Sequence, residues 1–217
     1  HQQNQAPDDR QPAILLPGVV TALLGLMLAV QLARTFILNE QSDPQLVYWL
    51  AFIPARGVFS GEYPGGWIPL LWTPFTHAFV HAGWEHLLIN CAWLAIFGTP
   101  VARRYGAWAT VILFLATAVA GAAAFAMTDL SDGQWLIGAS GGVAGLTGAA
   151  CRFIFQPVIV GRDPETGEAR VLGRRMATLG ELMRNLRAAF FIVVWLVLNA
   201  AVPFLPLLIG QSIGIAW

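Results

Sequence analysis

The sequence IGASGGVAGLTGAA occupies residues 137–150 and contains a Gly-x-Ser-Gly motif that leads into an apolar stretch. If a helix begins at Ser140, its hydroxyl lies where free backbone N–H groups and the helix dipole favour negative charge, a place to stabilise an oxyanion. Small residues also recur at four-residue spacing, as at Gly141 and Gly145, which is typical of closely packed membrane helices. The stretch alone supports a packing and a catalytic interpretation, and context has to distinguish them.

The composition indicates a membrane protein. Of the 217 residues, 57% are hydrophobic and only 11% are charged, whereas soluble domains carry about 25% charged residues. We therefore predict an all-α polytopic membrane protein whose helices pack as a bundle in contact with membrane lipid. The formal net charge is zero, so no basic field indicates a nucleic-acid partner.

Apolar runs of sufficient length to cross a bilayer define the predicted spans. They lie at 14–38, 84–101, 107–127, 140–156 and 188–208, and 210–217 resembles the start of a sixth span whose body is missing. We thus predict five complete transmembrane helices, a cytoplasmic tail at 1–13, and a transmembrane domain at 14–217 that is truncated at its C-terminal end. In the connection at 39–75, the short apolar run 46–53 is expected to lie at the membrane interface.

The connection at 158–187 carries two local signals. Its apolar segments 158–160 and 169–172 flank turn residues and predict a small β-hairpin. Thr178 and Glu181 have the spacing of a capping box, which predicts a helix that begins there and continues into the fifth span.

Arginine counts predict the orientation, because short cytoplasmic loops carry the excess of positive charge. Arg103 and Arg104 follow the second span. The 158–187 connection adds Arg162, Arg170, Arg174, Arg175, Arg184 and Arg187. With these connections and the N-terminus in the cytoplasm, the start of the second span and Ser140 both lie toward the outer face.

The segment THAFVHAGWEHLLIN at 76–90 lies at the same depth as Ser140 in this scheme. His86 and Asn90 are four residues apart and share one helix face, so an imidazole N–H and an amide N–H can point at one place. Polar side chains within a span are functional candidates, although interhelical hydrogen bonding is the alternative. His77 and His81 would lie on another side of a continuous helix, and structural hydrogen bonds are their favoured role.

Together these residues indicate acyl transfer. Ser140 would be the nucleophile, and its N–H would join His86 and Asn90 in an oxyanion hole whose backbone is shaped by Gly138 and Gly141. Serine needs a base, and His86 cannot easily be both base and donor. A zinc site is the alternative for three nearby histidines, but the spacing differs from HExxH, so we expect no metal.

At these residues the sequence resembles the rhomboid family of intramembrane serine proteases. The resemblance covers nearly the whole chain and rests on His77, His81, His86, Asn90, the run 102–106, Gly138, Ser140 and Gly141. It implies cleavage of transmembrane protein substrates near the outer end of a span, without metal or cofactor, and a catalytic histidine on the sixth span. No histidine follows His86, so we expect the base beyond Trp217 and the chain as given to be inactive.

Two other functions are compared with the protease. A rhomboid-like pseudoprotease would bind transmembrane clients without cleaving them, but the presence of Ser140 favours the enzyme. A channel or transporter would need repeats or paired interrupted helices, and the sequence shows neither. By analogy alone, a bacterial inner membrane is the expected location.

Overall fold

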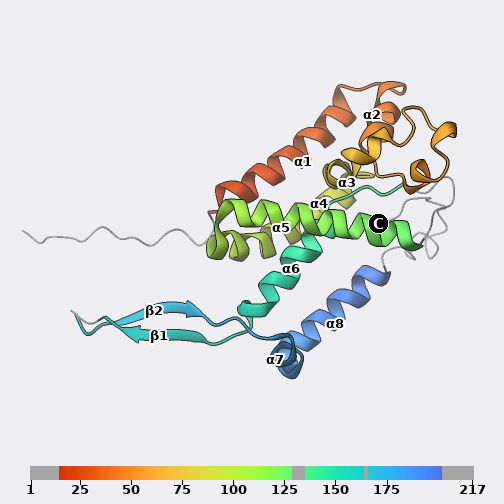
Figure 1. Cartoon of the computed structure of the whole chain (residues 1–217). Coiled ribbons are helices and arrows are strands. Elements are labelled where there is room, and N and C mark those ends of the chain that lie inside the picture. Colours follow the sequence, from red (N-terminus) through yellow and green to blue (C-terminus); the bar gives the residue numbers. More distant parts are fainter. Residues whose placement is uncertain (1–14, 129–134, 164–165, 202–217) are drawn as a thin grey trace, which may run out of the picture.

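The computed structural model describes residues 15–128, 135–163 and 166–201, and these residues are mostly helical (Figure 1). The α-helices are α1 (Gly18–Phe36), α2 (Ser42–Leu50), α3 (Thr73–Thr76), α4 (Trp84–Trp93), α5 (Thr99–Thr128), α6 (Ser140–Ile154), α7 (Leu179–Arg184) and α8 (Leu186–Ala201). The 3-10 turns are η1 (Pro54–Gly57), η2 (Ser60–Glu62), η3 (Ile68–Leu71) and η4 (His77–Phe79), and η5 (Leu94–Gly98) is a π-turn. The tail at 1–13, the end of the fifth predicted span and the start of the sixth lie outside the described residues.

Two of the described helical stretches are long and apolar enough to cross a membrane, namely Gly18–Phe36 and Trp84–Thr128. The second stretch is interrupted at Gly106, whose φ of 81° and ψ of 175° lie outside the helical region. Glycine reaches this positive φ without steric cost. The interruption lies between the predicted spans at 84–101 and 107–127.

Helix α6 packs closely on α5, and its small residues make this approach possible. A β-carbon added to Gly142 would lie 2.5 Å from the Phe114 ring, and one added to Gly145 would lie 2.2 Å from the Thr117 hydroxyl oxygen. Gly148 has open space beside it. The packing interpretation of the 137–150 sequence is therefore correct for one face of α6, and it does not exclude a site at the helix start.

The long connection between α1 and α4 is tied to the segment that precedes α6. Phe52 and Leu136 exchange two backbone hydrogen bonds of 3.0 and 2.9 Å. Within the connection, the fully buried Arg56 donates to the carbonyl of Pro64 at 2.8 Å, and its guanidinium lies 4.3 Å from the centre of the Tyr48 ring. These contacts give the irregular connection a fixed shape beside the start of α6.

The predicted hairpin is confirmed. Strands β1 (Val158–Arg162) and β2 (Ala169–Arg174) pair antiparallel, with a bulge between Ile159 and Val160, and they project away from the helices in Figure 1. The capping box of Thr178 and Glu181 is also present.

The prediction that this helix continues into the fifth span is wrong. Helix α7 ends at Arg184 because Asn185 adopts an extended conformation. The side-chain oxygen of Asn185 accepts from the backbone N–H groups of Arg187 and Ala188, at 3.1 and 3.3 Å. Asn185 therefore caps a separate helix, α8.

Candidate active site

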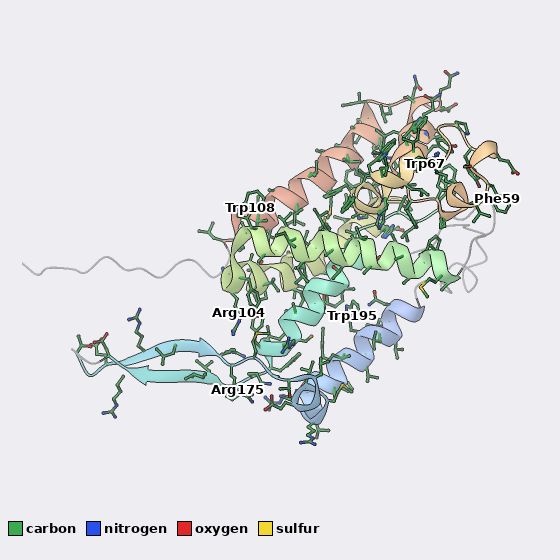
Figure 2. All side chains as sticks on the ribbon, in the orientation of Figure 1. Phe59, Trp67, Arg104, Trp108, Arg175 and Trp195 are labelled. Carbon is green, nitrogen blue, oxygen red and sulfur yellow. The ribbon has the colours of Figure 1, made fainter. Side chains whose placement is uncertain are left out.

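A cavity of about 270 Å³ lies between α4, α6 and α8. Its lining residues are His86, Ile89, Asn90 and Trp93 from α4, Ser140, Gly141, Val143 and Ala144 from α6, and Trp195 and Asn199 from α8. Trp195 is labelled in Figure 2 between α6 and α8. The cavity thus brings Ser140 together with His86 and Asn90, which lie far from it in the sequence.

Ser140 is the first residue of α6, and Ala139 is the N-cap. Its backbone N–H is therefore one of the groups that have no carbonyl partner within the helix. The approach to the helix is fixed by Gly138, which has a φ of 111° and donates its N–H to the carbonyl of His77 at 2.9 Å. A hydroxyl and a helix-terminal N–H consequently lie together beside the cavity.

His86 is 3% exposed, and one of its ring nitrogens has an identified role. Nδ1 accepts a long hydrogen bond of 3.5 Å from the backbone N–H of Ala82. A nitrogen that accepts carries no proton, so this contact is compatible with the neutral tautomer that has its proton on Nε2. The edge of the ring that carries Cε1 and Nε2 faces Gly138, where an added β-carbon would lie 2.6 Å from Nε2.

Asn90 is 5% exposed and lies one helical turn after His86. Its Nδ2 donates to the backbone carbonyl of His86 at 2.9 Å. This bond orients the amide, which has two N–H donors in all. Asn90 and His86 are therefore fixed relative to each other on the face of α4 that lines the cavity.

His77 and His81 make the structural hydrogen bonds that the sequence favoured. Nδ1 of His77 donates to the carbonyl of Thr73 at 3.0 Å, and Nε2 of His81 accepts from the backbone N–H of Ala139 at 3.3 Å. Burial lowers the pKa of His77, and it lowers the pKa of His81 to about 3, with smaller contributions from His86 and Arg34. Both rings are therefore neutral at pH 7.

His81 lies beside His86, because the continuous helix that would have separated them does not form. Their ring centres are 5.1 Å apart in an edge-on arrangement of 76°. The separation assumed a continuous helix, but Val80 is extended and Gly83 is also extended, so α4 begins only at Trp84. The break lets His81 turn back onto His86.

The wall formed by α8 was not predicted. Trp195 and Asn199 line the cavity, and Nδ2 of Asn199 donates to the carbonyl of Trp195 at 2.7 Å, which repeats the arrangement of Asn90 and His86. The position of Asn199 within an apolar stretch was the sequence signal that could have indicated this part of the cavity wall. Within the described parts of the chain, no three His, Cys, Asp or Glu residues are grouped to hold a metal ion.

The fold and the cavity define a helical membrane protein with a serine, a histidine and an asparagine gathered inside its bundle. The family model for the rhomboid domain matches residues 69–217, and the chain belongs to the rhomboid family.

Two relatives match a shorter part of the chain. Rhomboid-related protein 3 of Homo sapiens is 34% identical over 79 residues, and Rhomboid-related protein 3 of Mus musculus is 35% identical over 78 residues. Each match covers 36% of this chain and 19% of the relative. The matched segment therefore spans about a fifth of the length of these relatives.

Proposed function

We propose that the protein is an intramembrane serine protease that hydrolyses peptide bonds in or near the transmembrane segments of other proteins. The observation that carries the proposal is the cavity in which Ser140 of α6 meets His86 and Asn90 of α4. Membership of the rhomboid family supports the same reaction.

Ser140 is the proposed nucleophile. Its Oγ forms a bond to the carbonyl carbon of the scissile peptide, and the electron pair of the C=O double bond moves to the oxygen. Collapse of this intermediate expels the amine, which takes up a proton, and leaves an acyl-enzyme. Water then releases the acid and regenerates Ser140.

The oxyanion is assigned to three donors: the backbone N–H of Ser140, Nε2–H of His86 and Nδ2–H of Asn90. The long contact of Ala82 with Nδ1 is compatible with a proton on Nε2, which this role requires. One donor of this kind contributes about 2.7–4 kcal/mol to transition-state stabilisation.

A histidine that donates from Nε2 to the oxyanion cannot easily serve as the base as well, since a base must present an unprotonated nitrogen to the serine. His77 and His81 are bound to Thr73 and Ala139 instead. We therefore keep the assignment that the family resemblance implies, in which a histidine of the sixth span accepts the proton of Ser140.

The proposed orientation has the cavity opening toward the outer face and the N-terminus in the cytoplasm. In Figure 2, the labelled Arg104 and Arg175 lie at the opposite end of the molecule from Phe59 and Trp67 of the long connection. Arginine-rich ends face the cytoplasm, so this separation supports the orientation and a substrate cleaved near its outer end.

The proposal is tested with the full-length protein in liposomes that contain a reporter transmembrane substrate. We expect Ser140→Ala to abolish both cleavage and labelling by a fluorophosphonate, a reagent that reacts with activated serines. Ser60→Ala, in turn η2 outside the cavity, is the matched control and should retain both activities.

Two outcomes would overturn the proposal. Cleavage by Ser140→Ala at the parental rate would remove Ser140 as the nucleophile. A wild-type protein that crosslinks to the substrate, but neither cleaves it nor reacts with the fluorophosphonate, would be the pseudoprotease.

A further inference from the structure

Arg34 joins three parts of the chain outside the cavity. It lies in the last turn of α1, where Nε and Nη2 donate to the two carboxylate oxygens of Asp43 at 2.7 and 3.1 Å. Nη1 donates to the backbone carbonyl of His81. One guanidinium therefore connects the end of α1, the start of α2 and the loop before α4.

This cluster is mostly shielded from solvent. The side chain of Arg34 is 12% exposed and that of Asp43 is 30% exposed. A guanidinium offers five donors in a rigid planar arrangement, so a carboxylate on one edge leaves a donor in a fixed direction for another acceptor. The Asp43 carboxylate consequently sets the direction in which Arg34 meets His81.

His81 carries the connection into the site. Its ring nitrogen Nε2 accepts the backbone N–H of Ala139, the residue immediately before Ser140. The same ring contacts that of His86. Two successive hydrogen bonds thus lead from Arg34 through His81 to the backbone that presents the serine.

We propose that Arg34, oriented by Asp43, is a positioning residue for the Ser140 site. By binding the backbone carbonyl of His81, Arg34 fixes the position of the His81 ring. This ring accepts the N–H of Ala139 and packs against the ring of His86. Arg34 does not line the cavity, so it acts through His81 and not on the substrate. The inference rests on the proposed serine protease function.

Two substitutions in the full-length protein separate positioning from simple ion-pair stability. Arg34→Ala and Asp43→Ala both remove the ion pair, but only Arg34→Ala removes the donor to His81. We expect Arg34→Ala to lower kcat roughly tenfold at nearly unchanged KM, because the loss of its charge-assisted hydrogen bond to the carbonyl of His81 displaces the ring that positions Ala139 and His86. Asp43→Ala should lower kcat only about two- to threefold, because Arg34 keeps its contact with His81.

The double variant Arg34→Asp with Asp43→Arg provides a second test. It restores an ion pair between α1 and α2, but an aspartate cannot donate to the carbonyl of His81. We expect its thermal unfolding temperature to exceed that of Arg34→Ala while its kcat stays as low. Arg175→Ala is the matched control, since it breaks the exposed Arg175–Glu181 pair away from the cavity and should leave kcat unchanged.

Each result decides between the explanations. An active wild type in which Arg34→Ala leaves kcat unchanged, or in which the double variant recovers it, would overturn the positioning role alone. A wild type that neither cleaves the reporter nor reacts with the fluorophosphonate would overturn the proposed function and this inference with it.

Discussion

The imidazole of His86 lies directly against the α-carbon of Gly138. A β-carbon built on Gly138 would be 2.6 Å from both Cε1 and Nε2 of the ring, and Gly138 has a positive φ of 111°. Only glycine satisfies both conditions at low cost. Gly138 is therefore required both for the close contact with His86 and for the backbone conformation of the segment that leads to Ser140.

We expect Gly138→Ala to abolish cleavage, because the new methyl group must displace the His86 ring or the loop before Ser140. A left-handed conformation adds about 1–2 kcal/mol of strain. Gly148→Ala is the matched control, since Gly148 is helical and has open space around it. Equal kcat values and equal unfolding temperatures for the two variants would contradict the close contact between Gly138 and His86.

We expect Asn90→Ala to lower kcat by about 10²-fold with little change in KM, as for a donor that acts on the oxyanion. Steady-state cleavage of the reporter by the full-length protein measures both constants. Leu88→Ala, on the exposed side of the same helix, should leave kcat within about twofold. A rise in KM alone would assign Asn90 to substrate binding.

We expect Gly145→Ala to destabilise the protein by about 1–3 kcal/mol, because overpacked side chains force neighbouring helices apart. The added carbon would lie 2.2 Å from Oγ1 and 2.5 Å from Cβ of Thr117. Thermal unfolding in detergent measures the loss of stability. Adding Thr117→Gly removes the opposing side-chain atoms and should recover part of the lost stability. No recovery would mean that crowding against Thr117 of α5 does not cause the destabilisation.

Stability should fall as the pH decreases below about 6.5. The pKa of His81 is about 3 in the folded protein, against 6.5 for the ordinary group, so the unfolded chain binds the proton first. The lost stability accumulates from pH 6.5 toward pH 3, and the buried His77 adds to it in the same direction. Denaturant unfolding at pH 7.5 and pH 5 measures the slope, which His81→Gln should reduce.

Local sequence signals predicted the parts of the site that depend on helix geometry. His86 and Asn90 share a face because they are four residues apart, and the Gly-x-Ser-Gly motif marks the start of α6. The hairpin and the capping box were equally local. Each of these features is specified by residues that are near one another in the sequence.

The features that the sequence did not predict depend on tertiary contacts. The start of the second span at residue 84 was predicted, but no periodic pattern indicates that the extended residues before it bring His81 onto His86. Arg34 lies within an apolar run, and its partner Asp43 belongs to a different helix. Asn185 ended a helix that the capping box had predicted to continue, because its side chain supplied a new cap.

The π-turn η5 lies between the cavity and the arginines that follow the second span. In a π-helix the backbone hydrogen bonds join residues five apart, so each turn contains about one residue more than a turn of α-helix. Removal of one residue from Leu94–Gly98 should therefore leave an ordinary α-helical turn, with His86 and Arg103 in their present orientation.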